Sequence, residues 1–388
     1  MSGVENSKIL FLASWYPTRV LPFNGNFIFK HARSVKKQQV SFRVLSVCED
    51  TQLTRSFELV EGEEEGVKHL IVYYAAPFRI LKYVYKLLGY YKGLKYLKNT
   101  FGKIDLVHVH VMIDAGFVAL FLKLWKKIPY VITEHSTVFS PLNSKKYPKL
   151  LEPLIKATIK NCDYLLPVSN ELGANLIKIA PNQHLKKIPN VVDASLFEST
   201  GNRGKKPLLK FLHISSFAPV KNIRGILKTV KRLAEVRNDF SVTIAGDGNL
   251  EEIKALRKEL NVPSSVVELK GKMDETEVAT TLRAHDVFVL FSDFENLPCV
   301  LIEAQMCGMP IISTDVGGVA EIVSSTAFGV LITPRDENEL FDSMNKMIDD
   351  HQNYDSIMIK SKALELYSEE AVGRAFLEIY RSVLHIGE

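Results

Sequence analysis

The chain has 388 residues, of which 46% are hydrophobic and 24% are charged, and this predicts two globular domains and excludes disordered and fibrous classes. Its net charge of +5 is unevenly divided, because residues 1–200 hold 27 Lys and Arg against 16 Asp and Glu, and residues 201–388 hold 22 against 28. The four cysteines are scattered without a Cys-x-x-Cys pair, which argues against a disulfide framework or a structural zinc site and indicates a reducing compartment.

Short apolar runs alternate with helical patterns through the first half of the chain. We expect strands at residues 8–13, 40–47, 105–111, 129–133 and 163–168, with helices such as 27–37 and 115–126 between them. Such alternation is typical of parallel strands joined by crossover helices. The first apolar run, residues 9–13, is too short for a signal peptide or a membrane span, so we expect a cytoplasmic protein.

A basic segment rich in tyrosine begins at Arg79 and ends at Lys103. It contains no acidic residue, and its lysines at positions 82, 86, 92, 95 and 98 alternate with tyrosines at 83, 85, 90, 91 and 96. Anionic lipids attract lysine and tyrosine rings suit the headgroup level, so the segment favours peripheral contact with the inner face of a membrane. The alternative is a solvated helix with a tyrosine-rich core face. Nucleic acid is not expected, because no nucleic-acid motif accompanies the charge.

The pattern of strands and helices begins again in the second half. We expect strands at residues 209–214, 241–245, 286–291 and 310–313 and helices at 226–237, 250–260 and 300–306. Residues 198–207 are polar and contain glycine, which predicts a linker. The expected fold is therefore α/β, with two Rossmann-like, doubly wound parallel-sheet domains facing across a cleft. We expect these domains at residues 1–195 and 206–370, with a C-terminal helix, about 371–388, crossing back onto the first.

Two glutamates flank a predicted helix start in the second half. Glu295 follows a predicted strand, and Glu303 comes eight positions later inside a predicted helix. Ligands bind at the carboxyl ends of parallel strands, where amides at a helix N-terminus attract anions. The N–H groups of Asn296 and Leu297 in the opening turn suit a phosphate, Glu295 suits sugar hydroxyls, and Glu303 is placed to reach a ribose diol. On spacing alone, the alternative is a helix N-terminal acid followed by an exposed helix charge.

The segment that begins at Glu295 and ends at Pro310 resembles the E-x7-E motif of retaining family-4 glycosyltransferases with the GT-B fold. It reads Glu-Asn-Leu-Pro-Cys-Val-Leu-Ile-Glu-Ala-Gln-Met-Cys-Gly-Met-Pro. Six further segments match the family in the same order along nearly the whole chain. They are Asn24-Gly25-Asn26, Thr133-Glu-His135, residues 188–193, Pro219-Val-Lys221, Ala245-Gly-Asp-Gly248 and residues 314–318.

The resemblance implies a retaining hexosyltransferase of the bacterial polysaccharide type. It would move a sugar from a nucleotide diphosphate sugar, with UDP-sugars favoured, bound by the C-terminal domain, to a saccharide or lipid-linked acceptor on the N-terminal domain. Its catalytic residues would be His135 beside the donor sugar and Glu295 at the sugar hydroxyls. The residues at the diphosphate would be Lys221, Ser216, Asn296, Leu297, Gly25 and Asn26. The residues at the ribose and base would be Glu303, Lys272, Met273 and Gly246.

Two features depart from other sugar transferases. Where many family members have Gly-Arg-Leu before the lysine, this chain reads Ser215-Ser216-Phe217, so that second cation is absent. The sequence has no Asp-x-Asp, so we expect a metal-independent reaction without a cofactor, although His108 and His110 share one strand face and form an alternative metal site. Two other functions remain open: a nucleotide-sugar epimerase of related fold and a non-catalytic member that binds nucleotide sugars.

Overall fold

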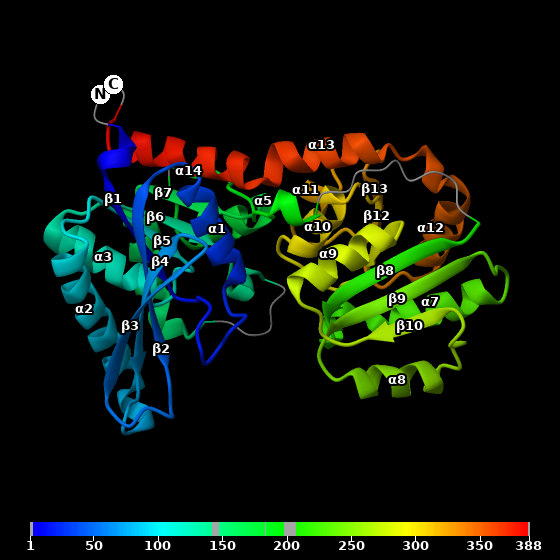
Figure 1. The fold of residues 1–388 in the computed structure, drawn as a ribbon, viewed down its shortest axis with the longest axis horizontal. Helices are drawn as coiled ribbons and strands as arrows, with labels where there is room; N and C mark the ends of the chain where they lie inside the picture. Colours follow the sequence, from blue (N-terminus) through cyan, green and yellow to red (C-terminus); the bar gives the residue numbers. More distant parts are fainter. Residues whose placement is uncertain (1–2, 142–146, 183, 198–206, 387–388) are drawn as a thin grey trace. The chain divides into compact units, whose positions relative to one another are not determined.

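In the computed structural model, which describes residues 3–141, 147–182, 184–197 and 207–386, the chain forms two compact units (Figure 1). The first consists of residues 1–191 and 369–388, and the second of residues 192–368. Each unit contains a sheet with helices packed on it, as the alternation of strand and helix patterns predicts. The predicted linker lies outside the described residues, except for Pro207.

The first unit has a seven-stranded sheet in the order β3-β4-β2-β1-β5-β6-β7. Its strands are β1 (Lys8–Ala13), β2 (Ser41–Glu49), β3 (Phe57–Glu64), β4 (Val67–Tyr74), β5 (Leu106–His110), β6 (Tyr130–Glu134) and β7 (Tyr164–Pro167). All neighbouring strands are parallel except β3 and β4, which form an antiparallel hairpin that we did not predict. Glu65 and Gly66 connect them with φ of 47° and 77°, and two positive φ values are typical of a type I′ turn.

Helices cover both faces of the first sheet. They are α1 (Asn26–Lys36), α2 (Lys82–Thr100), α3 (Ala115–Lys126), α4 (Glu152–Asn161), α5 (Asn170–Ile179) and the C-terminal helix α14 (Glu369–Val383). Helix α14 lies beside α1 in this unit (Figure 1), where Phe376 and Tyr380 pack into the same core as Phe11 of β1. Among the described helices, none combines the length and the hydropathy that a membrane span requires.

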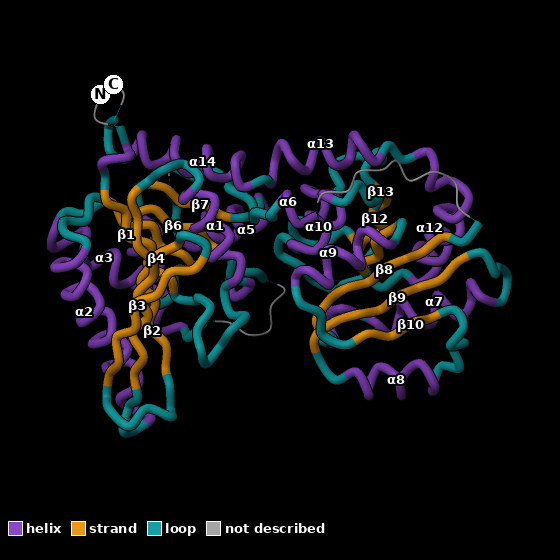
Figure 2. Tube along the Cα trace, in the orientation of Figure 1, coloured by secondary structure: helices purple, strands orange, loops and turns teal. Residues whose placement is uncertain are grey.

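The second unit has a six-stranded, fully parallel sheet in the order β10-β9-β8-β11-β12-β13. Figure 2 shows β8, β9 and β10 side by side in orange. Its strands are β8 (Leu209–Ser216), β9 (Phe240–Asp247), β10 (Val267–Lys270), β11 (Val287–Leu290), β12 (Ile311–Thr314) and β13 (Gly329–Ile332). Its helices are α6 (Ala194–Phe197), α7 (Ile223–Ala234), α8 (Leu250–Glu259), α9 (Glu275–Ala284), α10 (Cys299–Met306), α11 (Val319–Ile322), α12 (Glu337–Asp350) and α13 (Ser356–Tyr367).

Both sheets reverse their winding direction once, which confirms the predicted doubly wound class. In the first sheet the chain adds β2 and β4 on one side of β1, and then β6 and β7 beyond β5 on the other. In the second sheet the corresponding switch lies between β8 and β11. Parallel sheets bind ligands beyond the carboxyl ends of their strands at such switch points. The loops that follow β1, β5, β8 and β11 are therefore the places to look for a functional site.

Candidate functional site

The switch point of the second unit brings together two charged residues that are 74 positions apart in the sequence. Lys221 lies in the loop after β8, and Glu295 lies in the loop after the neighbouring strand β11. Lys221 Nζ donates to Glu295 Oε1 at 2.5 Å, and Glu295 is only 7% exposed. The residue predicted for the diphosphate and the residue predicted for the sugar thus form one ion pair, largely shielded from solvent.

Neighbouring strand ends hold the Glu295 carboxylate in place. Ser292 Oγ donates to Glu295 Oε1 at 2.7 Å, and Thr314 Oγ1, at the end of β12, donates to the carbonyl oxygen of Ser292 at 2.6 Å. Gly317 has a φ of 58°, and a Cβ at this position would lie 2.0 Å from the Glu295 carbonyl oxygen. A side chain at position 317 would therefore displace the loop. We assigned no role to Ser292 or to Thr314, which begins the matched segment 314–318, although both follow the rule that sites lie at strand ends.

Helix α10 begins one residue earlier than the sequence analysis expected. Its first residue is Cys299 and its N-cap is Pro298, so Asn296 and Leu297 precede the helix. The expectation that their amides belong to its opening turn is therefore wrong. Their loop is nevertheless closely packed, because Gly318 N donates to the Asn296 carbonyl oxygen at 2.6 Å and Leu297 is buried.

Glu303 lies in the second turn of α10 and is 9% exposed. An exposed helix charge, which was the alternative interpretation of this residue, is excluded by that burial. Carboxylates are rarely buried without a partner, because desolvation of the charge is costly. The burial of both Glu295 and Glu303 therefore distinguishes them from ordinary surface acids.

The ends of β8 and β9 approach each other closely. Ser215 pairs with Gly246, and a Cβ at position 246 would lie 1.8 Å from the Ser215 carbonyl oxygen. Strand packing alone thus requires glycine at this position. His213 Nε2 lies 2.7 Å from Ser215 Oγ, and burial lowers the pKa of His213 to about 4, so this ring is neutral at pH 7. Ser216, the last residue of β8, is exposed.

A surface pocket of about 490 Å³ lies beside the end of β10. Gly271, Lys272 and Met273 contribute to its lining, and the sequence analysis assigned the base to the backbone at the last two. Lys272 Nζ lies 3.5 Å from Asp247 Oδ2, so the ends of β9 and β10 are joined by an exposed ion pair.

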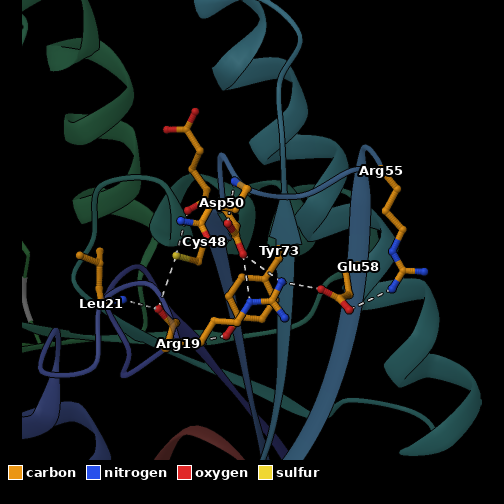
Figure 3. Close-up of polar contacts among 10 residues, drawn as sticks. Arg19, Leu21, Cys48, Asp50, Arg55, Glu58 and Tyr73 are labelled. Carbon is orange, nitrogen blue, oxygen red and sulfur yellow. Dashed lines mark hydrogen bonds and ion pairs between the residues drawn. The ribbon is translucent and has the colours of Figure 1, made fainter.

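In the first unit, the loop after β1 is held by Arg19 (Figure 3). The Arg19 guanidinium lies over the ring of Tyr73 at 3.9 Å, Nε donates to Asp50 Oδ2 at 2.9 Å, and Nη2 donates to Glu58 Oε2 at 2.5 Å. Tyr73 lies on β4, Asp50 directly follows β2, and Glu58 lies on β3. The Arg19 side chain therefore connects the loop to the edge of the sheet. Sequence reasoning missed this residue, since no motif includes it.

The same loop ends at Gly25, which has a φ of 76° and caps α1. A Cβ at this position would lie 2.7 Å from the carbonyl carbon of Trp15, so a larger residue is excluded both by backbone conformation and by space. Asn26 is the first residue of α1 and is exposed. Both candidates thus lie at a helix N-terminus at the carboxyl edge of the first sheet.

His135 follows β6 directly and is 8% exposed. Its Nδ1 lies 3.2 Å from Asn190 Oδ1, and its backbone N–H donates to Glu134 Oε1 at 2.9 Å. Burial raises the pKa of Glu134 to about 7 against the opposing effect of three backbone hydrogen bonds. Asn190 belongs to the matched segment 188–193, so folding brings that segment into contact with the histidine. His135, Gly25 and Asn26 all belong to the first unit, and the other candidates belong to the second.

The rings of His108 and His110, the alternative metal pair, lie side by side with their centroids 4.1 Å apart. His108 Nδ1 lies 2.7 Å from Tyr380 Oη, and Nε2 lies 2.7 Å from Thr133 Oγ1, so both of its ring nitrogens are engaged. His110 also lies beside His31 and His135, with ring centroids 5.7 and 6.0 Å away. The hydrogen bonds of His108, and not its distance from His110, therefore argue against a metal site made of this pair.

Comparison with known proteins places the chain among sugar transferases. The model of glycosyltransferase family 4 matches residues 26–196, and the model of glycosyl transferases group 1 matches residues 195–363. N-acetyl-alpha-D-glucosaminyl L-malate synthase of Bacillus anthracis is 28% identical over 299 residues, which are 72% of this chain and 75% of that protein.

Solved structures share the fold along almost the whole chain. Sucrose-phosphate synthase of Thermosynechococcus elongatus has a TM-score of 0.77 at 17% identity, covering 97% of this chain and 99% of that one. HepE of Anabaena, in complex with UDP, has a TM-score of 0.73 at 15% identity, covering 97% of this chain and 100% of that one. With two parallel-sheet domains and two family models that together match residues 26–363, the chain belongs to the family-4 glycosyltransferases of the GT-B fold.

Proposed function

We propose that this glycosyltransferase moves a sugar from a UDP-sugar to a saccharide or lipid-linked acceptor, with retention of configuration. The observation that carries the proposal is the ion pair of Lys221 and Glu295 at the switch point of the second sheet. A cation that suits phosphate and a carboxylate that suits hydroxyl groups meet at 2.5 Å. A donor binding there would find partners for its diphosphate and for its sugar side by side.

The two groups would act on different parts of the donor. The Lys221 ammonium would donate to the diphosphate, whose negative charge grows as the bond to the sugar breaks, and the Glu295 carboxylate would accept hydrogen bonds from sugar hydroxyls. Ser292 and Thr314 fix the orientation of that carboxylate before any ligand binds. Preorganised groups of this kind stabilise the transition state because they need no rearrangement during the reaction. In a retaining reaction the acceptor attacks from the face that the UDP leaves.

The rest of the donor would extend toward the ends of β9 and β10. Glu303 would hold the ribose hydroxyls, and the pocket at Lys272 and Met273 would receive the base. A complex of UDP with the structural neighbour HepE supports UDP as the nucleotide. His135, from the first unit, would contact the donor sugar.

The donor assignment predicts selective stabilisation by uridine nucleotides. At a hundred times its dissociation constant, a ligand adds about 2.7 kcal/mol to the free energy of unfolding. We expect UDP and one UDP-sugar to raise the midpoint of thermal unfolding, and GDP-mannose at the same concentration to leave it unchanged. If configuration is retained, nuclear magnetic resonance of the transfer product should show the same anomeric configuration at the new glycosidic bond as in the UDP-sugar. Stabilisation by GDP-mannose alone, or conversion of the donor to an isomer without an acceptor, would contradict the assignment.

The surface of the first unit supports a membrane-bound acceptor. Helix α2 packs on the sheet through Gly89, Tyr90, Gly93 and Leu97, and Cβ atoms at the two glycines would lie within 2.7 Å of Val47 and Leu45 side chains. Its large apolar residues therefore face outward. They are exposed at i, i+1, i+4, i+5 and i+8, namely Tyr83, Val84, Leu87, Leu88 and Tyr91. Of the five tyrosines in residues 79–103, Tyr90 alone is buried, so the alternative of a tyrosine-rich core face is wrong.

Helix α3, which lies beside α2 (Figure 1), carries a second stripe of exposed apolar residues. The two helices touch where Lys86 pairs with Asp114, the residue that precedes α3. The stripe on α3 consists of Phe121, Leu124 and Trp125, the last of which is 74% exposed. Lysines at 92, 95 and 98 on α2 and at 126 and 127 next to the α3 stripe are also exposed. Apolar side chains with surrounding lysines suit an anionic lipid bilayer, which we propose as the partner of this face.

The membrane proposal predicts binding that depends on both charge and apolar contact. The protein should sediment with vesicles of mixed anionic and neutral lipid at low salt, and far less with neutral vesicles or at high salt, because salt screens exposed charges. Replacing Lys92, Lys95 and Lys98 with Gln should weaken binding by about 1 kcal/mol per lysine. Trp125→Ser should also weaken binding, whereas Ile357→Ser should not, because Ile357 is similarly exposed but lies in the second unit. Equal sedimentation of all variants would refute the assignment.

A further inference from the structure

Three buried histidines gather at the switch point of the first unit. His31 lies on α1, His110 ends β5, and His135 follows β6. One ring nitrogen of each lies within 4.8 Å of those of the other two, and the ring centroids are 5.2, 5.7 and 6.0 Å apart. A tetrahedral zinc ion with bonds of about 2.0–2.1 Å holds its nitrogens about 3.4 Å apart. Small side-chain rotations, moving each ring by less than about 1 Å, would therefore close a zinc site.

Neighbouring oxygens determine which nitrogen two of these rings present. Pro189 O lies 3.0 Å from His31 Nε2, and because a carbonyl oxygen only accepts, Nε2 carries the proton and Nδ1 keeps its lone pair. In the same way, Asn190 Oδ1 at 3.2 Å places the proton of His135 on Nδ1 and leaves the lone pair on Nε2. A ring N–H donated to an oxygen, with the other nitrogen presented as a ligand, is the usual second shell of a metal-bound histidine.

The third ring has no such partner. Within the part of the chain that the structure describes, neither ring nitrogen of His110 has a hydrogen-bond partner, and the ring is fully buried. Buried polar groups are normally satisfied, so an unpartnered imidazole facing two others calls for an explanation. Val111, the next residue, has a φ of 62°, which is unfavourable for a β-branched residue. Backbone strain of this kind clusters at functional sites.

The ligand that zinc requires is a neutral imidazole, which presents one nitrogen lone pair. Neutral imidazole is a preferred ligand of zinc and its neighbours in the first transition series.

We propose that His31, His110 and His135 bind one Zn²⁺ ion, with water in the fourth position. The inference depends on the first unit alone and does not depend on the transfer reaction proposed above. A ring bound to zinc cannot at the same time contact a donor sugar. Zinc bound there would therefore compete with the contact proposed above between His135 and the donor sugar.

The test uses the full chain without a histidine tag, stripped of metal with a chelator. Equilibrium dialysis with elemental analysis should give one zinc per chain, and Co²⁺ should give the visible absorption of a tetrahedral site. His31→Gln and His110→Gln should each weaken zinc binding by at least about 100-fold, since even second-shell changes cost 10–100-fold. Asn190→Ala should fall within that second-shell range.

His285→Gln is the matched control. His285 is also buried, but its Nδ1 and Nε2 lie 2.7 and 2.8 Å from Thr281 O and Thr243 Oγ1, so this variant should keep one zinc per chain. X-ray absorption at the zinc edge of the unaltered protein should count three imidazole ligands, and it needs no variant to fold. A parent protein that binds no stoichiometric zinc, or one with fewer imidazole ligands, would overturn the proposal. Unchanged binding by folded His31→Gln and His110→Gln variants would overturn it as well.

Discussion

Glu295→Ala should lower kcat by about 10²–10³-fold and leave the affinity for UDP within about threefold of the parent. The carboxylate is placed to contact the sugar, so its loss removes stabilisation of the transition state and not contacts to the nucleotide. Lys221 loses its partner in this variant, but its ammonium remains available to the diphosphate. The measurements are initial transfer rates at saturating donor and calorimetric titration with UDP. An equal loss of UDP binding would show that Glu295 contacts the nucleotide instead.

Two variants sharpen this prediction. Glu295→Gln keeps an acceptor for Ser292 and removes the charge, so its kcat should lie between those of the parent and of Glu295→Ala. Glu303→Ala should have the opposite profile, weakening UDP and UDP-sugar together by about 1.5–3 kcal/mol, the contribution of a hydrogen bond to a charged group. Thermal unfolding of each variant checks that the fold is retained. If Glu295→Ala and Glu303→Ala had the same profile, the separate roles for sugar and ribose would be wrong.

Lys221→Ala should lower kcat by about 10–150-fold, because a charge-assisted contact contributes about 1.5–3 kcal/mol. The affinity for UDP should fall less, because the leaving group gains charge in the transition state. The structure gives a second reason for weaker donor binding by Lys221→Ala. Without Lys221, the buried Glu295 carboxylate has lost its cation and repels the diphosphate beside it. The double variant Lys221→Ala/Glu295→Gln should therefore bind UDP more tightly than Lys221→Ala. Lys228→Ala is the matched control, because Lys228 lies on α7 and pairs with Glu337 at 3.1 Å.

Ser216→Arg tests the missing second cation of the family pattern. Ser216 ends β8 and is exposed, so a longer side chain has room there. An arginine can hold phosphate with two parallel hydrogen bonds, so Ser216→Arg should tighten UDP binding and partly restore kcat to Lys221→Ala. Transfer rates and UDP titrations of both single variants and the double variant give the answer. If Lys221→Ala is indistinguishable from the parent in both assays, the diphosphate binds elsewhere.

Elements that depend on local patterns were predictable from the sequence. Ile226, Val230 and Leu233 recur at helical spacing, and all three are fully buried on α7. The start of that helix was misplaced by three residues, because the cap at Asn222, whose side chain accepts from Gly225 N, leaves no mark on the hydrophobic period. The β3–β4 hairpin was missed because its turn, Glu65-Gly66, lacks the Asn-Gly or Asp-Gly signature of such turns.

The sequence by itself determined the doubly wound class, the family and the order of the candidate residues, because periodicity and motif spacing are properties of neighbouring positions. Only the tertiary structure decided which of those residues meet. Lys221 and Glu295 pair because the strands before them are neighbours at a switch point, although nothing in their spacing of 74 positions requires it. Tertiary structure likewise decided the partners of the histidines. His108 and His110 are two positions apart, yet hydrogen bonds engage the first while the second joins His31 from another element, because the chemistry of a side chain depends on what folding packs around it.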